Sequence, residues 1–183
     1  MLDKFEVVEQ FGPYRFIGKT IYTRAWQETS IAIERASWHL CDWVFITLDN
    51  MAEYTSDQKY NYALFTWERH DDKNQLMGYT IGRFMKPDTP VPDGMEYYDI
   101  DATSVAQGWA SGNIEDIKRL DQVHNDLYSK TGGPTFDALA QAGYDEKCGQ
   151  WSAQVFPVGY PKNPQPCDDG KYYVGNFVPC VKK

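Results

Sequence analysis

The side chains with the clearest capacity for chemistry in this sequence are aromatic: 6 Trp, 13 Tyr and 9 Phe among 183 residues. This number exceeds what a core needs, and aromatic rings are the side chains most often found in ligand pockets. We therefore predict a site that encloses a flat small molecule by stacking, each ring contributing about 0.5–2 kcal/mol. Core packing is the alternative for any single ring, so the prediction rests on the whole set. The candidates are Tyr22, Trp38, Tyr62, Phe65, Tyr79, Trp109, Trp151 and Phe156, with Gln107 and Gln154 as polar anchors.

Residues for metal or nucleophilic chemistry are sparse and scattered. No pair of cysteines forms a Cys-x-x-Cys motif, and no Gly-x-Ser-x-Gly motif is present. The sequence therefore predicts no metal, no cofactor and no assigned catalytic residue, with reduced, structural thiols. The residues considered are Cys41, Cys148, Cys167, Cys180, His39, His70 and His124.

The charge of the chain bears on its partners. Asp and Glu number 26 against 18 Lys and Arg, a formal net charge of -8. Such a chain repels phosphate backbones and anionic membranes unless a basic stripe offsets the charge, and none is present. No apolar run approaches the roughly 20 residues that a membrane span requires, and no signal peptide is evident at the N-terminus. We expect a cytoplasmic protein that contacts neither nucleic acid nor membrane.

The first half of the chain reads as strand, helix, strand, strand. Residues 5–23 are rich in β-branched and aromatic side chains, with a turn at Gly12 and Pro13 that gives one kinked strand or two short ones. Residues 30–51 lack Gly and Pro and predict one long helix with a broad apolar face. Residues 60–68 and 76–84 predict antiparallel strands around a polar turn.

The second half repeats this order after a proline-rich linker, residues 87–92. Residues 95–109 predict a strand, and Asn113 caps a helix that Gly132, Gly133 and Pro134 end. After an irregular segment, residues 151–156 and 171–181 predict two more strands. The loop at 158–170 contains three prolines and is either a lid over the site or a solvated excursion.

This repeated order predicts the fold class. We expect one α+β domain over residues 1–183, built from two pseudo-twofold β-α-β-β units at 1–86 and 93–183. Their strands form a mainly antiparallel sheet, with two long helices and a central ligand cleft at the open face or the seam between the halves.

Three segments carry a resemblance to a known family. Residues 92–112 run from a proline and glycine through a strand, a small-residue corner and a second strand to a glycine before the helix. Residues 151–157 resemble a Glu-x-Tyr-Pro strand, and residues 172–182 a closing strand with a penultimate proline. Together they resemble the GyrI-like domains, the effector-binding domains of bacterial transcription regulators. The chain begins almost at its first strand and so resembles the stand-alone members without a helix-turn-helix domain.

The resemblance implies a central cleft that binds small, often aromatic or cationic molecules. Where the family commonly has a buried glutamate this chain has Gln154, and Phe156 replaces a tyrosine. An amide attracts a cation less than a carboxylate does. Glu68 or Glu96, each next to aromatic strand positions, could supply a charge instead, although a solvated strand residue is the simpler interpretation of either.

Three functions stay open on this basis. The first is a multidrug- or effector-binding protein without catalysis, whose partner is an aromatic small molecule. The second is a hydrolase of reactive small molecules, as some stand-alone members of the family are, in which a carboxylate activates water. The third is an acidic inhibitor that docks on a basic protein such as gyrase, where the charge of -8 would speed association.

Overall fold

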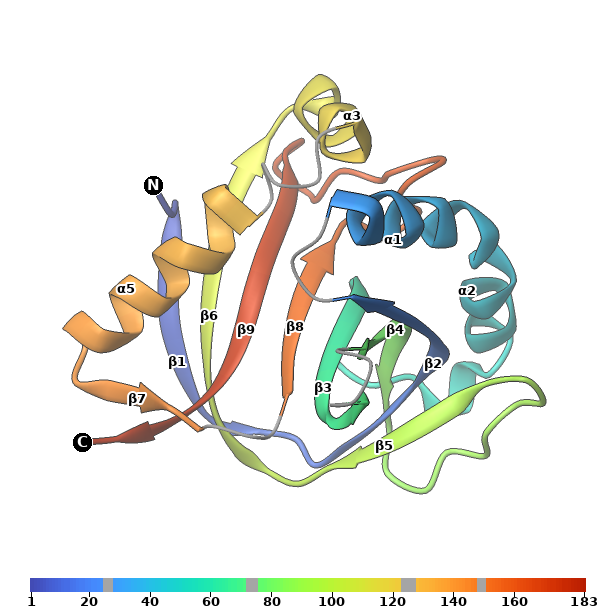
Figure 1. Ribbon diagram of the computed structural model, residues 1–183, viewed down its shortest axis with the longest axis horizontal. Coiled ribbons are helices and arrows are strands. Elements are labelled where there is room, and N and C mark those ends of the chain that lie inside the picture. Colours follow the sequence, from blue (N-terminus) through green and yellow to red (C-terminus); the bar gives the residue numbers. More distant parts are fainter. Residues whose placement is uncertain (25–27, 72–75, 123–127, 148–150) are drawn as a thin grey trace.

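The computed structural model describes residues 1–24, 28–71, 76–122, 128–147 and 151–183. Its α+β class agrees with the expectation: nine strands form one antiparallel sheet that does not close (Figure 1). The strands are β1 (Lys4–Phe11), β2 (Tyr14–Arg24), β3 (Asn61–Asp71), β4 (Leu76–Met85), β5 (Glu96–Ile100), β6 (Thr103–Gly112), β7 (Tyr144–Glu146), β8 (Trp151–Phe156) and β9 (Tyr172–Lys182).

The order of the strands places the two halves side by side. The sheet runs β1-β6-β9-β8-β3-β4-β2-β5, with β7 attached to β9. This order reads the same from both ends when β1, β2, β3 and β4 are exchanged with β5, β6, β8 and β9. Such symmetry is what a duplication requires, and the duplication itself stays a prediction. β3 pairs with β8 at the centre of the sheet, and the two outer strands β1 and β5 each pair with a strand of the other half, β6 and β2.

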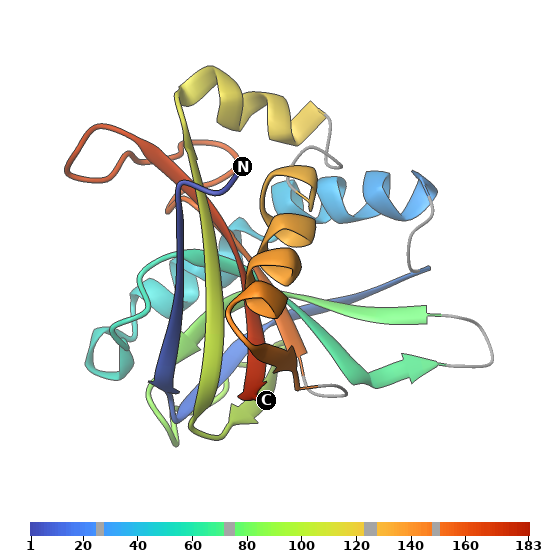
Figure 2. The ribbon, with the colours of Figure 1, turned by 90° about the vertical axis from the view of Figure 1, so that its left-hand side faces the viewer.

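The helices pack on one face of this sheet, which we call the helix face. Val44 and Leu48 pack there with Ile17 and Ile81 of the sheet, and Leu139 packs on Ala106 nearer the other end. Figures 1 and 2 show the helices at residues 28–49 over one part of the sheet and the helix at residues 133–141 over another. None of the helices in the described ranges is long and apolar enough to cross a membrane. The helical segments are α1 (Glu28–Leu40), α2 (Asp42–Asp49), the 3-10 turn η1 (Ala52–Tyr54), α3 (Ile114–Gln122), the π-helical turn η2 (Tyr128–Gly132) and α5 (Gly133–Gln141).

The expectation of one long helix over 30–51 is wrong, because the helix breaks at Cys41, whose φ is -98° and ψ is 14°. α1 lies against β2 and α2 against β4, and Trp38, Cys41 and Val44 are all buried around the break. The change of direction lets both segments keep their apolar sides on a curved sheet. Two long helices are therefore not confirmed.

The expected end of the second helix at Gly132, Gly133 and Pro134 is also wrong. α5 begins there, with Pro134 in its first turn. Proline is well tolerated at that position because the first N–H groups of a helix have no partner within it. The expected irregular segment that follows is in fact α5 and β7.

The predicted strands were mostly confirmed, with one division. Residues 60–68, 76–84, 151–156 and 171–181 fall on β3, β4, β8 and β9, and the first extended segment is two strands, β1 and β2. The expected strand at 95–109 is divided into β5 and β6 by a corner at Asp101 and Ala102. That corner lets β5 pair with β2 and β6 with β1, at opposite ends of the sheet.

The sheet buries apolar side chains on both faces. Opposite the helices, the sheet curls over an aromatic cluster of Phe11, Phe84, Trp151 and Phe177, with ring centroids 5.2–5.8 Å apart. We call this the opposite face. Because successive residues of a strand point to opposite sides, each central strand contributes side chains both to the core under the helices and to the aromatic cluster of the opposite face.

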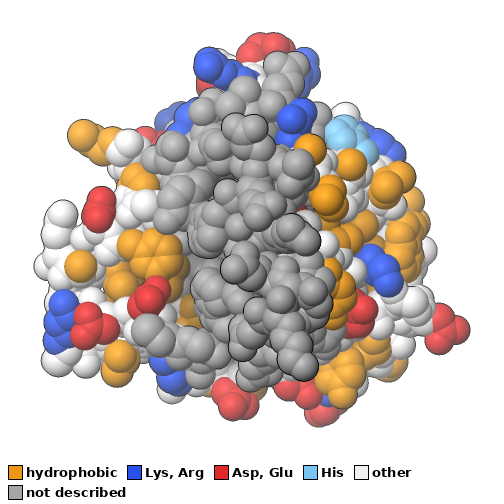
Figure 3. Space-filling view, viewed as in Figure 1, with side chains coloured by type: hydrophobic (Ala, Val, Ile, Leu, Met, Phe, Trp, Pro, Cys, Tyr) orange, Lys and Arg blue, Asp and Glu red, His pale blue; other side chains and the backbone are white. Residues whose placement is uncertain are grey.

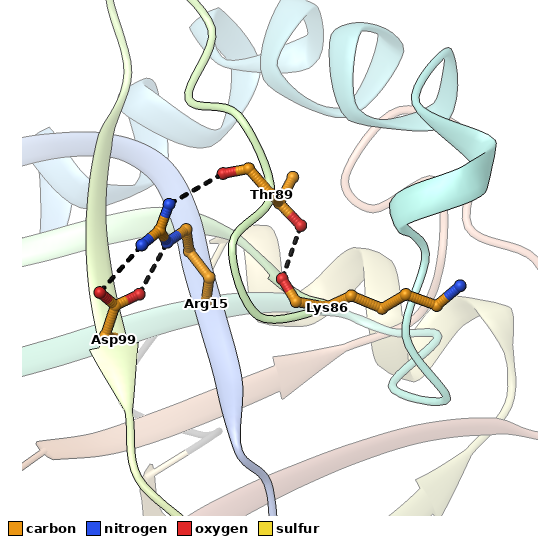
Figure 4. Close-up of polar contacts among 4 residues, drawn as sticks. All are labelled: Arg15, Lys86, Thr89 and Asp99. Atoms are coloured by element: carbon orange, nitrogen blue, oxygen red, sulfur yellow. Dashed lines mark hydrogen bonds and ion pairs between the residues drawn. The ribbon is translucent and has the colours of Figure 1, made fainter.

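The linker between the halves is held by one arginine (Figure 4). Arg15 of β2 donates from Nε and Nη2 to the two carboxylate oxygens of Asp99 on β5, at 2.7 and 3.0 Å. Its Nη1 donates to the backbone oxygen of Thr89 at 3.1 Å, and the Thr89 hydroxyl donates to the backbone oxygen of Lys86 at 2.6 Å. The arginine thus ties the linker to the sheet edge that β5 forms.

Replacing Asp99 by asparagine should lower the free energy of unfolding at pH 7 by about 0.5–1 kcal/mol, a small effect because water screens an exposed ion pair. Hydrogen bonds from the Arg15 guanidinium hold the pKa of Asp99 below its usual range. A carboxyl group of this kind stabilises the fold above its unfolded pKa of about 3.9 and loses that contribution as the pH falls through its folded pKa. Urea unfolding should show a difference that persists at about pH 5 and shrinks below pH 4. A difference independent of pH would contradict this assignment.

Candidate functional site

Two hydrogen bonds join three side chains across the helix face at the centre of the sheet. Trp38 of α1 donates from Nε1 to the hydroxyl of Tyr79 on β4 at 3.0 Å. That hydroxyl donates to Oε1 of Gln154 on β8, also at 3.0 Å. All three side chains are buried. Gln154 is therefore held by a ring from the sheet and, through it, by the helix above.

Aromatic rings surround these contacts. Phe65 lies edge-on to Tyr79 with ring centroids 4.9 Å apart, and Phe156 lies 4.6 Å from Trp38. The structure thus brings together five of the predicted ligand-binding residues on the helix face: Trp38, Phe65, Tyr79, Gln154 and Phe156.

A second carboxamide lies beside Gln154. Asn176 of β9 is its Cα partner across the β8-β9 pair, so both side chains point to the helix face. Asn176 is only 7% exposed, and its Nδ2 has no hydrogen-bond partner in the described part of the chain. Because Gln154 Oε1 already accepts from Tyr79, the amide nitrogen is the atom that Gln154 has left to offer. Each of these neighbouring residues therefore has an amide N–H group available on the helix face.

The α5 helix borders the other side of this pair. The Cα partner of Asn176 on β6 is Gly108, and a Cβ at Gly108 would lie 1.9 Å from Oγ1 of Thr135 in α5. Glycine is required there because the helix approaches the strand so closely. The amide pair therefore lies at the midline of the sheet, between α1 on one side and α5 on the other.

Figure 3 shows the molecule as a space-filling view from the same side as Figure 1. Hydrophobic side chains gather over α1 and α2, where Ile33, Leu40, Trp43 and Ile46 are exposed. The described surface over α1 and α2 is therefore rich in hydrophobic side chains.

One buried carboxylate belongs to the helix face. Glu34 of α1 is 6% exposed and accepts a hydrogen bond from the Thr23 hydroxyl at 3.1 Å. Burial raises the pKa of Tyr79 well above its usual value, and the negative charge of Glu34 adds to that rise. Tyr79 therefore stays protonated and keeps donating to Gln154 over the physiological pH range.

The remaining predicted residues lie elsewhere. Tyr22 is half exposed on β2, and the side chain of Glu68 lies outside the described residues. Glu96 accepts the backbone N–H of Thr20 at 2.7 Å, at the β2-β5 edge. The other members of the predicted set point to the opposite face: Tyr62, Gln107, Trp109 and Trp151.

Sequence reasoning missed two polar residues of the helix face, Asn176 and Glu34. Glu34 stands three residues after Ile31 and four before Trp38, a spacing that places all three on one side of a helix. Asn176 is a polar residue within the apolar closing strand, flanked by Gly175. Both signals mark a polar side chain on a buried surface, but neither indicates what the side chain faces.

No group of three His, Cys, Asp or Glu residues in the described ranges is arranged to hold a metal ion. The loop at 158–170, which could have been a lid or an excursion, borders a pocket on the opposite face through Val158, Gln165 and Cys167.

Comparison with known proteins supports the fold. No family model matches the chain, and no curated protein matches it in sequence. Among solved structures it is similar to SAV2435, solved bound to tetraphenylphosphonium, at 8% identity over 97% of this chain and 94% of that one, with a TM-score of 0.57. An integron cassette protein from the mobile metagenome of Vibrio cholerae is 10% identical over 98% and 97%, with a TM-score of 0.53. The C-terminal domain of EcmrR is 11% identical over 98% and 97%, with a TM-score of 0.50. The chain shares the fold of these proteins, and the resemblance to GyrI-like domains is confirmed at the level of the fold.

Proposed function

We propose that this protein binds an aromatic small molecule on its helix face, and that the molecule carries a hydrogen-bond acceptor which reaches Gln154 and Asn176. The observation that carries the proposal is the buried Nδ2 of Asn176, which has no partner in the described part of the chain. Leaving a buried donor unsatisfied costs about 1–3 kcal/mol. A ligand acceptor at this position would remove that cost.

The surroundings suit a flat ligand. Phe65, which is partly exposed, supplies aromatic surface beside the amide pair, while the fully buried Trp38 and Tyr79 hold Gln154 in place. Apolar walls with a few placed polar groups are the usual composition of small-molecule sites. Proteins of the same fold support this function, since one was solved with tetraphenylphosphonium and another is the C-terminal domain of EcmrR.

The charge of the ligand follows from the donors. Two adjacent amide nitrogens favour a carbonyl or ether oxygen and offer nothing to a cation. The Tyr79 hydroxyl already donates to one lone pair of the Gln154 oxygen, which reduces what that oxygen can give to a cation. We therefore propose a neutral, acceptor-bearing aromatic ligand rather than a cationic one.

Replacing Asn176 by leucine should remove the hydrogen-bond contribution to ligand binding while raising the free energy of unfolding by about 1 kcal/mol, because the substitution removes the unsatisfied donor and keeps the branched shape with the same number of heavy atoms. The probe is 9-fluorenone, a flat neutral ketone, compared with fluorene, which has the same rings without the oxygen. We expect thermal-shift and calorimetric titrations to show fluorenone binding to the native protein at least about tenfold more tightly than fluorene, and this preference to vanish in the variant.

Asn61 provides the matched control. It is equally buried, but its Oδ1 accepts from Nη2 of Arg83 at 3.0 Å, so Asn61→Leu should destabilise the fold by about 1–3 kcal/mol. Equal binding of fluorene and fluorenone would contradict the proposal. Tighter binding of tetraphenylphosphonium would instead assign the site to cations, with Glu34 as the relevant charge. Recovery of a probe with the mass of one added water would indicate a hydrolase.

A further inference from the structure

A pocket of about 540 Å³ opens on the opposite face of the sheet. It lies among β1, β6, β9 and two loops, the segment at 57–60 and the loop at 158–170. Gln107 and Phe177 are Cα partners that line it, and Phe177 is the strand neighbour of Asn176. Since neighbours on a strand point to opposite sides, the whole sheet separates this pocket from the amide pair described above. Its volume is in the range that holds drug-sized molecules.

The walls of the pocket are aromatic. Trp109 lies 5.2 Å from both Tyr60 and Phe177, measured between ring centroids, and Phe11 lies 4.9 Å from Tyr14. All five rings line the pocket. They offer faces and edges on which a flat molecule can stack.

One buried polar side chain points into this aromatic space. Gln107 lines the pocket and is only 7% exposed, and no residue in the described ranges hydrogen-bonds its carboxamide. The carboxamide is therefore open to the pocket, where a ligand can reach it. It presents an N–H donor and a C=O acceptor side by side, the complement of a ligand edge that carries the same pair.

The interior of the pocket is uncharged. Burial and the hydrogen bond to Asp57 raise the pKa of Tyr14 to about 12, and burial together with Cys167 raises that of Tyr60 above its usual range. Both phenols are therefore neutral near pH 7. The charged residues of the lining, Asp57 and Lys59, are exposed and of opposite sign, so the pocket favours a neutral molecule over either kind of ion.

We propose that this pocket is a second ligand site, which takes a flat, uncharged heteroaromatic molecule with a lactam-type edge, an adjacent ring N–H and C=O. The edge pairs with the carboxamide of Gln107 in two hydrogen bonds, and the rings stack on Trp109 and Tyr60. The assignment does not depend on the function proposed for the helix face.

The test uses quinolin-2-one, which has such an edge, and N-methylquinolin-2-one, which lacks only the N–H. Titration calorimetry on the full chain should show the N-methyl compound binding at least about tenfold more weakly. Gln107→Leu should weaken quinolin-2-one to the same degree, while Gln141→Leu, at an exposed position of α5, should leave its affinity unchanged. Gln154→Leu reports binding on the helix face. Equal affinities for the two compounds, or a loss in Gln154→Leu alone, would overturn the proposal.

A second readout needs no substitution. Cys167 lines the pocket, is partly exposed, and has its Sγ 3.6 Å from the hydroxyl of Tyr60. Bound quinolin-2-one should slow the alkylation of Cys167 by iodoacetamide at least about fivefold at saturation, as followed by peptide mass spectrometry. Binding without this protection would place the compound elsewhere and overturn the assignment, as would the absence of any binding.

Discussion

Replacing Trp38 by alanine should lower the free energy of unfolding by about 3–5 kcal/mol, the usual cost of deleting a buried Trp. Trp38 has no exposed surface, and its ring lies 4.6 Å from Phe156 and 5.2 Å from Tyr160, between centroids. The substitution also removes the donor to Tyr79, which leaves the buried hydroxyl with one partner fewer. Urea unfolding, followed by the signal of the remaining tryptophans, measures the loss.

Two variants make this expectation specific. Trp38→Phe keeps most of the packing and loses the hydrogen bond, so it should cost about 1–2 kcal/mol. Trp43→Ala removes the same type of side chain from α2, where it is 40% exposed, and should cost under about 1 kcal/mol. If Trp38→Ala were no more costly than Trp43→Ala, then α1 would not be held to the sheet by this ring.

Replacing Gly82 by alanine should cost about 3 kcal/mol or more, because the added Cβ has no space. Gly82 of β4 is the Cα partner of Gly18 on β2. A Cβ at Gly82 would lie 2.0 Å from the backbone oxygen of Ile17 and 2.7 Å from the Cα of Gly18. Backbone atoms cannot yield as a flexible side chain does, so β2 and β4 would have to separate. The midpoint of urea unfolding reports the change.

Gly133 is the matched control, since a Cβ there meets no atom within 4 Å and the residue opens α5. Gly133→Ala should leave stability unchanged or raise it by up to about 1 kcal/mol, because alanine has less freedom to lose on folding. Similar losses in both variants would mean that the glycines matter through backbone freedom and not through contact between the strands.

The sequence was informative wherever structure depends on near neighbours. Alternating residues predicted β3, β4, β8 and β9, and the prolines between residues 86 and 94 predicted a segment without helix or strand, which the structure has. These patterns are local, since each side chain of a strand points away from the next whatever the fold. The helices were harder to predict. The bend at Cys41 depends on the curvature of the sheet, and no local sequence pattern describes that curvature.

The candidate site depended far more on tertiary structure. The sequence determined a supply of aromatic rings and two glutamines, and it placed them on strands and helices in a GyrI-like order. The sequence could not show which of these residues lie on the same face of the sheet. The structure assigns Trp38 and Gln154 to the helix face, and Gln107 and Trp109 to the opposite face.

Pairing across strands decided the rest. Asn176 lies 22 residues after Gln154, and only the register of β8 with β9 makes the two amides neighbours. A shift of that register by one residue would turn Asn176 to the other face. The composition and local periodicity of this chain thus determined which elements form and which chemistry they carry. The sheet register, set by the packing of the whole core, decided which of these side chains meet.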